Sequence, residues 1–238
     1  VYARVSPSDK LRIVRALKQA GNVVTITGDS VQDADALAAA DVGCAIGKFG
    51  ADVAKGSADI VISNNRFESI VCAVKESRGL FDNIKKSVYY LLSCNFAELI
   101  VILFGMIIFG VAPLAAVPLL WINLLTDCAP AVSLSMERAE HSAMKRKPYT
   151  TLGKIFDLGA VASIAIESIF IAVMTLIAYN SGEKDSGAAA MTMAFAVLGM
   201  SQIFHCFNSK LEGTLISKQL FSNGFLNFSA VITLFIII

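Results

Sequence analysis

Charged residues are scarce in this sequence. Asp, Glu, Lys and Arg make up 16% of its 238 residues and apolar residues make up 55%, whereas an ordinary soluble domain is roughly 25% charged. This composition excludes a wholly water-soluble protein and predicts one that lies largely in a membrane. The 20 basic and 19 acidic residues nearly balance, and the basic ones stand beside apolar runs. No basic, aromatic-rich face for nucleic acid is therefore expected.

Paired cysteine motifs are also lacking. The five cysteines, at positions 44, 72, 94, 128 and 206, have no CxxC or other metal-binding spacing, which argues against a zinc site and a disulfide framework. No charged-then-apolar leader opens the sequence, which begins abruptly at Val1 and stops in the apolar residues 236–238. We therefore expect the sequence to be a piece of a longer polypeptide.

An acidic residue, Asp127, stands inside an apolar run from about Leu114 to Leu134. The run is long enough for a membrane-spanning helix, and an Asp at the centre of such a helix costs about 2.5 to 3.5 kcal/mol. Asn123, Thr126 and Asp127 share one helical face. Pro130 cannot donate to the carbonyl of Thr126, so the helix should open beside the carboxylate. This pattern predicts a cation site, and the simpler alternative is a polar contact between helices.

The first 66 residues have the pattern of a water-soluble α/β segment. Residues 9–17 and 35–40 predict helices, and the short runs 23–27, 42–46 and 60–63 predict buried parallel strands. Alternation of strands and helices predicts a doubly wound sheet. Such sheets bind their ligands at the carboxyl ends of the strands.

Two carboxylates, Asp29 and Asp33, follow the first predicted strand directly after Gly28. One or two carboxylates with a substrate phosphate form a typical Mg²⁺ site, and the ammonium of Lys10 could neutralise phosphoryl charge. Alternatively, these carboxylates only cap the following helix. The residues by themselves leave both interpretations open.

Residues 67–87 predict a stalk helix with a polar surface that leads into the membrane. The expected organisation is a soluble part at 1–66, the stalk at 67–87 and a membrane part at 88–238. Within the first span, Asn95 and Glu98 share a face. The predicted spans are at about 88–109, 114–134, 158–179, 188–207 and 225–238, the last one cut short.

The loops at 137–157 and 208–223 carry most of the basic residues between the spans. By the positive-inside rule, these loops and the soluble part face the cytosol. Glu167 falls inside the third span. We expect it to be a surface carboxylate that extends to the membrane interface.

Several motifs together resemble those of P-type cation-transporting ATPases of the calcium-pump branch. Residues 25–37 resemble the hinge motif TGDGVNDAPAL, residues 5–10 the lysine motif before it, and residues 50–55 the GTDVAK stretch after it. Residues 121–130 resemble the ion-site span WVNLVTDGLPA, and residues 144–148 the loop that follows that span. The similarity covers nearly the whole sequence, with the motifs in the family's order.

This resemblance implies the end of a haloacid-dehalogenase-like phosphorylation domain, joined by a stalk helix to an all-α membrane bundle. It implies ATP-driven cation transport through an aspartyl-phosphate, most simply Ca²⁺ efflux across a bacterial plasma membrane. Its partners would be membrane lipid, the transported cation and the remainder of its own pump. That remainder would supply the phosphorylated Asp, the actuator and nucleotide domains and the early spans, so this chain by itself should not hydrolyse ATP.

The resemblance also implies roles for individual residues. Asp29 would hold Mg²⁺, Asp33 would support the phosphorylation site, Lys10 would contact the phosphoryl group and Gln32 would bind the cofactor. The ligands of the transported cation would be Asn95, Glu98, Asn123, Thr126 and Asp127, with Gln202 as a further candidate.

The sequence departs from the family's pattern at a few positions. Ser30 replaces a Gly, Gln32 an Asn and Asp35 a Pro of the hinge motif, so a catalytically impaired pump or a regulatory membrane protein stays an alternative. A pump for Na⁺ or K⁺ is another, although Asn123 matches the calcium branch. Gln202 replaces an acid of pumps that carry two Ca²⁺, which predicts one Ca²⁺ per cycle.

Overall fold

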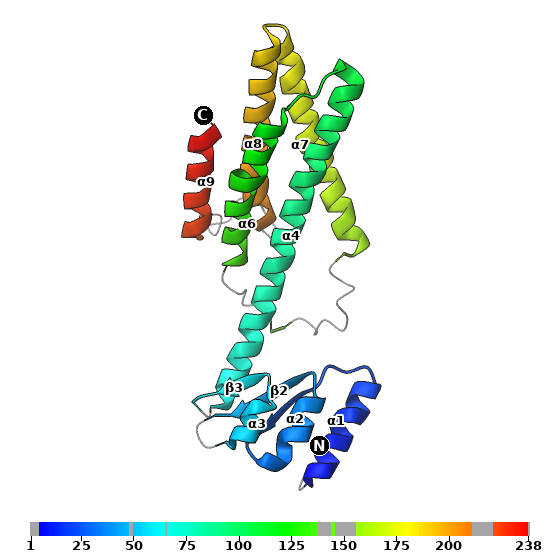
Figure 1. Cartoon of the computed structure of the whole chain (residues 1–238), viewed down its shortest axis with the longest axis vertical. Coiled ribbons are helices and arrows are strands. Elements are labelled where there is room, and N and C mark those ends of the chain that lie inside the picture. Colours follow the sequence, from blue (N-terminus) through cyan, green and yellow to red (C-terminus); the bar gives the residue numbers. More distant parts are fainter. Residues whose placement is uncertain are drawn as a thin grey trace. The chain divides into compact units, whose positions relative to one another are not determined.

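The computed structural model describes residues 5–47, 50–64, 66–137, 144–145, 156–210 and 221–237. The chain divides into two compact units, with the division between Ser77 and Arg78 (Figure 1). This division lies within the stretch predicted as a stalk. The predicted basic loops at 137–157 and 208–223 lie largely outside the described residues.

The first unit contains a small parallel sheet with helices between its strands. Its elements are α1 (Pro7–Gln19), β1 (Thr25–Gly28), η1 (Val31–Asp33), α2 (Ala34–Ala39), β2 (Val42–Ile46), α3 (Asp52–Gly56) and β3 (Ile60–Ile62). The strands lie in the order β1, β2, β3, with Thr25 opposite Val42 and Cys44 opposite Ile60. The predicted parallel strands are therefore present.

Local sequence explains most of these boundaries. Ser6 caps α1 by accepting a hydrogen bond from the backbone N–H of Asp9, and Pro7 occupies the first turn, where it needs no donor. The first strand begins later than predicted, because the backbone N–H of Val24 donates to the Asp41 carboxylate at 2.9 Å instead of to a neighbouring strand.

The helices of this unit share one layer. The helix α2 packs against β1, β2, α1 and α3. Successive right-handed crossovers in a sheet of sequential order put the crossover helices on the same face. The described residues therefore show one helical layer, and the doubly wound, haloacid-dehalogenase-like fold stays a prediction.

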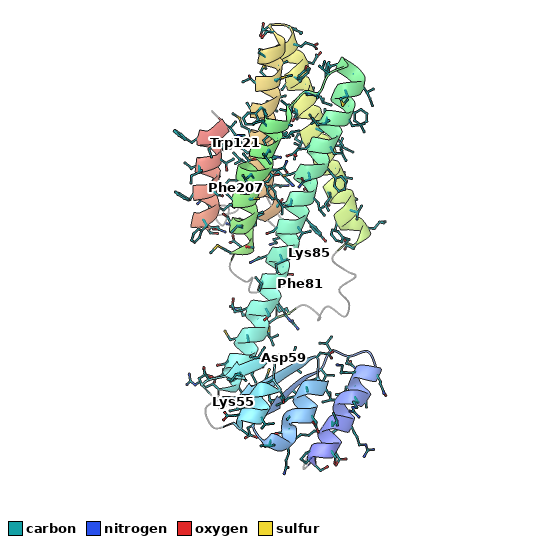
Figure 2. The ribbon with its side chains drawn as sticks, in the orientation of Figure 1. Lys55, Asp59, Phe81, Lys85, Trp121 and Phe207 are labelled. Atoms are coloured by element: carbon teal, nitrogen blue, oxygen red, sulfur yellow. The ribbon has the colours of Figure 1, made fainter. Side chains whose placement is uncertain are left out.

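The second unit is a bundle of long helices. The helix α4 (Phe67–Phe109) begins in the first unit and runs for 43 residues without interruption. After it come α5 (Ala116–Trp121), the π-helical segment η2 (Ile122–Asp127), α6 (Cys128–Ser135), α7 (Leu158–Glu183), α8 (Gly187–Lys210) and α9 (Gly224–Ile237). Figure 2 shows Trp121 and Phe207 among the side chains of this bundle.

Among the residues that the structure describes, four helices are long and apolar enough to cross a membrane: α4, the run Ala116–Ser135, α7 and α8. They cover the first four predicted spans. The fifth predicted span overlaps α9, which is apolar but has 14 residues. By composition and length, the second unit is the membrane part of a multi-pass protein.

Small residues allow the helices α7 and α8 to pack closely. A Cβ atom at Gly182 would lie 2.7 Å from Cα of Ala190, so the crossing of these helices requires glycine there. Close approach through small side chains is the usual basis of helix association in membranes, where no hydrophobic effect drives the helices together.

The described residues of the bundle form two buried apolar clusters, which occupy different levels along the helices. The first is built from Ala97, Val101, Leu114, Ile122, Ile171, Ala172, Tyr179, Ala190, Ala194 and Leu198. The second is built from Tyr90, Cys94, Ala131, Leu134, Cys206 and Leu226. On the η2–α6 run and on α8, the residues between these clusters include predicted polar ligands, and on α4 Glu98 lies beside Ala97 of the first cluster.

Candidate functional site

The predicted phosphoryl site contains an ion pair between a buried carboxylate and a partly exposed ammonium. The ammonium of Lys10, on α1, lies 2.6 Å from Oδ1 of Asp33, whose side chain is 5% exposed. The other oxygen, Oδ2, accepts a hydrogen bond from the Ser30 hydroxyl at 2.8 Å and weaker ones from the backbone N–H groups of Asp29 and Ser30 at 3.4 Å. Both carboxylate oxygens are therefore satisfied within the protein.

Burial raises the pKa of Asp33, but the hydrogen bonds from Lys10 and Ser30 and the positive charge of Lys10 outweigh burial, so this pKa lies below its ordinary value. The position of Asp33 also depends on Gly28. A Cβ atom at residue 28 would lie 2.6 Å from Cβ of Asp33, closer than two carbons can approach. The glycine of the motif thus makes room for the carboxylate.

The neighbouring predicted residues are exposed. Asp29 follows the carboxyl end of β1, and its carboxylate has no partner among the described residues, whereas its backbone oxygen accepts from Ala51 at 3.0 Å. Gln32 is exposed on η1. The structure therefore brings Lys10 and Asp33 together and leaves Asp29 and Gln32 open to solvent.

The second candidate site lies inside the membrane unit and is centred on Glu98, which is 7% exposed. Its oxygen Oε2 accepts from the Asn123 amide at 2.7 Å, and Oε1 accepts from the Gln202 amide at 3.1 Å. The helices α4 and α8 and the segment η2 each contribute one of these residues. Three predicted ligands that are far apart in sequence thus meet at one point.

Asp127, which is 1% exposed, lies in the same region. Its oxygen Oδ1 accepts from the Tyr90 hydroxyl at 3.4 Å, but Oδ2 is buried without any hydrogen-bond partner among the described residues. Thr126 donates to the carbonyl of Ile122 at 2.6 Å and is 3.4 Å from Oε1 of Gln202. A buried carboxylate oxygen without a donor is costly unless it gains a proton or a cation.

The expected opening of the helix takes the form of a π-helix. The residues Ile122–Asp127 are π-helical, and the chain then continues as α6, which contains Pro130. Proline leaves the carbonyl one turn before it without a donor, and widening of the helix accommodates this loss without a complete break. Such π segments occur frequently at functional sites.

Two expectations about polar residues differ from the structure. Asn95 is exposed, and its amide donates to the carbonyl of Leu91 at 2.7 Å, so it lies outside the cluster around Glu98. Three residues turn a helix by about 300°, which leaves Asn95 and Glu98 only roughly aligned. Glu167 is not a surface carboxylate extended to the interface, because it lies 3.6 Å from His205 and within hydrogen-bonding reach of Ser93.

The sequence interpretation did not include Tyr90 among the site residues. A signal for it was available, because Tyr90, Cys94 and Glu98 are spaced by four residues and share one face of α4. Tyr90 is fully buried. Its hydroxyl donates to Oδ1 of Asp127 at 3.4 Å.

Asn123, Thr126, Asp127 and Gln202 lie between the two apolar clusters along their own segments, whereas Glu98 lies at the level of the first cluster, between Ala97 and Val101 on α4. Glu98 is also about 16 Å from the end of α4 at 1.5 Å per residue, roughly half the thickness of a bilayer's hydrocarbon core. These features define a multi-pass membrane protein with a carboxylate-bearing polar site within its helix bundle.

Comparison with known proteins identifies the family. The family model described as "Cation transporting ATPase, C-terminus" matches residues 111–238, and this chain belongs to that family of cation-transporting ATPases. The chain is 41% identical to calcium-transporting ATPase 1 of Bacillus cereus over 98% of its own length and 28% of the relative. It is 39% identical to a calcium-transporting ATPase of Listeria monocytogenes over 100% of its length and 27% of the relative.

A calcium-transporting ATPase of Bacillus subtilis is 38% identical over 95% of this chain and 26% of that protein. The chain thus spans about a quarter of the length of these relatives. The resemblance to the calcium-pump branch of P-type ATPases, drawn from separate motifs, is confirmed.

Proposed function

We propose that this chain is the C-terminal part of an ATP-driven pump that exports Ca²⁺, and that Asp127 holds the transported ion. The observation that carries this proposal is the buried oxygen Oδ2 of Asp127, which has no donor among the described residues. A cation at this oxygen would remove the cost of burying it. The names of the relatives support Ca²⁺ as that cation.

The chemistry of the surrounding groups suits Ca²⁺, which binds six to eight oxygens of carboxylates, carbonyls and water. Asn123 lies one turn before Asp127 and uses its amide nitrogen toward Glu98, which leaves its amide oxygen for a cation. Thr126 and the widened π-helical backbone add further oxygens. Glu98 would complete the site after its amide partners shift.

The bonding of Gln202 supports a stoichiometry of one Ca²⁺ per cycle. Its amide nitrogen donates to Glu98 at 3.1 Å and its oxygen is 3.4 Å from Thr126. Gln202 thus acts as a neutral bridge where a second carboxylate would be needed for two divalent ions. Counting bound radioactive Ca²⁺ per phosphoenzyme tests this stoichiometry, and a ratio of two would refute it.

The first unit would serve phosphoryl transfer in the same pump. The exposed carboxylate of Asp29 fits Mg²⁺, because its oxygens have no other partner among the described residues and Mg²⁺ binds one or two carboxylates together with phosphate and water. Bound there, Mg²⁺ would neutralise phosphate charge. Asp33 would hold Lys10 and the loop in place, Lys10 would contact the phosphoryl group, and Gln32 would lie near the cofactor.

The rest of the pump would provide the aspartate that is phosphorylated by ATP, the actuator and nucleotide domains and the early spans. In this arrangement the first unit is the end of a haloacid-dehalogenase-like domain and faces the cytosol. The membrane would be a bacterial plasma membrane, in keeping with the bacterial relatives.

The geometry at Ser30 favours an active pump over an impaired one. Its φ angle is −106°, a conformation that any L-residue adopts, so the glycine of the family's motif is not required here. The hydroxyl of Ser30 in addition donates to Asp33 at 2.8 Å. The substitution therefore adds a hydrogen bond to the loop without straining it.

The decisive experiment is formation of phosphoenzyme from labelled ATP, in membranes that contain the full-length protein, over a series of free Ca²⁺ concentrations. We expect labelling to require Ca²⁺, and Asp127→Asn to lose that requirement or the labelling itself. Asp185→Asn is the matched control, because Asp185 is exposed in the turn between α7 and α8. Labelling that depends on another cation would overturn the choice of Ca²⁺, and no labelling at all would favour an impaired pump.

A further inference from the structure

A second polar cluster lies in the membrane unit, outside the residues proposed to bind the transported cation. Its centre is the pair of Glu167 on α7 and His205 on α8, whose Oε2 and Nε2 atoms are 3.6 Å apart. Ser93 and Asn208 approach the same carboxylate at 3.4 Å. None of these residues has a role in the proposed transport site.

The two members of the pair differ in their access to a proton. The Glu167 side chain is 33% exposed, whereas that of His205 is 5% exposed. The atom Nε2 of His205 is buried and makes no hydrogen bond in the part of the chain that the structure describes. An imidazole nitrogen that faces a carboxylate and lacks any other partner is suited to share a proton with that carboxylate.

Both residues lie toward the end of the bundle that carries the basic loops. Glu167 is about 14 Å from the start of α7 at Leu158, and His205 is about 8 Å from the end of α8 at Lys210, at 1.5 Å per residue. The positive-inside rule puts that end in the cytosol. The pair is therefore placed to respond to the cytosolic proton concentration.

The ring of Tyr90 connects this pair to the transport site. It stacks on the ring of His205, with 5.5 Å between centroids and 28° between planes. The hydroxyl of the same Tyr90 donates to Oδ1 of Asp127 at 3.4 Å. The side chain of Tyr90 thus contacts both the imidazole of His205 and the proposed cation ligand Asp127, so a change at the imidazole can reach the ligand through Tyr90.

We infer that Glu167 and His205 form a proton-binding site whose occupancy lowers the affinity of the Asp127 site for its cation. This inference rests on the proposed function. With one proton absent the pair carries a net charge of −1, and with that proton bound it is neutral, so protonation removes negative charge that attracts a divalent cation. The pump would therefore bind cytosolic Ca²⁺ more weakly as the cytosol becomes acidic.

Other titratable groups surround the pair and must be separated from it. They are Tyr90, Cys94 and Glu98 on α4, Asp127 on η2, and Cys206 and Lys210 on α8, while the sequence of α9 contains none. Lys210 lies 3.6 Å from Glu137 and donates to Ser222. Asp127 and Glu98 will themselves give Ca²⁺ binding some dependence on pH, so the test compares variants at every pH.

The test measures equilibrium binding of radioactive Ca²⁺ by the full-length protein between pH 6 and pH 8. As the pH is lowered from 8 to 6, we expect the Ca²⁺ affinity of the wild type to fall by about threefold to tenfold more than the affinity of either Glu167→Gln or His205→Gln. The Ca²⁺ affinities of the two variants should differ from that of the wild type in opposite directions. His205→Gln keeps the charge at −1 and binds more tightly than wild type at pH 6, whereas Glu167→Gln keeps it at zero and binds more weakly at pH 8.

The control is Glu183→Gln, which removes an exposed carboxylate from the other end of α7 and should leave the wild-type profile unchanged. A purely structural role for the pair would shift both variants in the same direction. That result, or a profile of His205→Gln that matches wild type, would overturn the inference.

A proton measurement separates this inference from the proposed function. In protein labelled with ¹⁵N-histidine, the signal that is lost in His205→Gln should titrate, and the midpoint should shift in Glu167→Gln. If that shift occurs and Ca²⁺ does not bind at any pH, the proposed function fails while the proton site stands. If the signal does not titrate between pH 4 and pH 9, the proton site is refuted whether or not Ca²⁺ binds.

Discussion

Asp33 in the first unit and Asp127 in the membrane unit are both buried aspartates, but their surroundings differ. Asp33 has the ammonium of Lys10 at 2.6 Å on one oxygen and the hydroxyl of Ser30 at 2.8 Å on the other. Asp127 has the hydroxyl of Tyr90 at 3.4 Å on one oxygen and no partner on the other among the described residues. Both carboxylate oxygens of Asp33 therefore have partners within the protein, while one oxygen of Asp127 is left for the proposed cation.

This difference shows how a protein separates two uses of the same side chain. A carboxylate that is saturated by internal donors holds a loop in one conformation. A carboxylate that is buried and left unsaturated stores an unfavourable energy that binding of an ion removes. The predictions that follow test this contrast.

Among the substitutions of uncharged residues, the largest effect concerns the two asparagines. Asn123 donates to Glu98 at 2.7 Å, whereas Asn95 is exposed and bonded to its own helix. We expect Asn123→Ala to lower the Ca²⁺ affinity by roughly 30-fold or more, because a buried carboxylate loses a donor and the cation loses an oxygen. Asn95→Ala should lower it less than about tenfold. Equal losses would mean that Asn95 is a ligand of the same rank, as the resemblance to the family implies.

Gln202→Glu tests the neutral bridge. The new carboxylate would face Glu98, which now accepts from the amide of Gln202 at 3.1 Å. Like charges in a low dielectric repel each other unless a cation lies between them. We predict an added dependence of phosphoenzyme formation on pH, with Ca²⁺ needed at about threefold to tenfold higher concentration below pH 7. An unchanged profile would show that Gln202 does not approach Glu98 in the working protein.

The ion pair in the first unit contributes to stability. We expect Lys10→Gln to destabilise the segment around Asp33 by about 1 to 2 kcal/mol, because it leaves a buried carboxylate without its counter-ion. Hydrogen exchange of peptides that cover residues 23–40 in the full-length protein measures this. Arg12→Gln is the control, since the pair of Arg12 with Asp9 is exposed. Equal protection in both variants would contradict the structural role of the pair.

The same carboxylate gives this segment a dependence on pH. The pKa of Asp33 is lower in the folded protein than its ordinary value, because the bonds and charge of Lys10 and Ser30 outweigh burial. Its stabilisation is therefore complete above about pH 4 and is lost as the pH falls through the lowered folded value. In Asp33→Asn this acid-dependent loss of protection, corrected for intrinsic exchange rates, should shrink. An identical acid profile would show that other groups cause it.

The smallest effect is expected for Ser30→Gly, which restores the family's residue. It removes the hydroxyl that donates to Asp33 at 2.8 Å and adds backbone freedom, so we expect a loss of about 0.5 to 1 kcal/mol in local stability. Phosphoenzyme formation should change by less than about threefold. A large gain in activity would indicate that Ser30 impairs the pump.

The sequence predicted those features that depend on a single segment. The apolar runs located the four helices long enough to span a membrane, and the β-branched runs located the parallel strands. The shared face of Asn123, Thr126 and Asp127 predicted a polar region beside Pro130. Hydropathy and period are properties of one segment, which is why they can be interpreted without knowledge of the fold.

Other features depend on which helices are neighbours. The contact of Gln202 with Glu98 joins residues far apart in the chain; no period in α8 indicates which helix lies opposite, and only the resemblance to the family placed both residues in one set of candidate ligands. Glu167 faces His205 and not the membrane interface for the same reason. The opening of the helix before Pro130 was expected, but its form, a π-helix at Ile122–Asp127, could not be predicted from this segment alone.

The measurement that tests the contrast most directly is equilibrium binding of radioactive Ca²⁺ to the full-length protein in the absence of ATP, with Asp127→Asn and Asp33→Asn side by side. We predict that Asp127→Asn weakens binding by more than about 100-fold, because it removes the charge that the buried site leaves unpaired. Asp33→Asn should bind Ca²⁺ with wild-type affinity. In the wild type both oxygens of Asp33 are already bonded, to Lys10 and to Ser30, so this carboxylate is not expected to hold the cation. Wild-type binding by Asp127→Asn would contradict the assignment of that residue as the centre of the cation site.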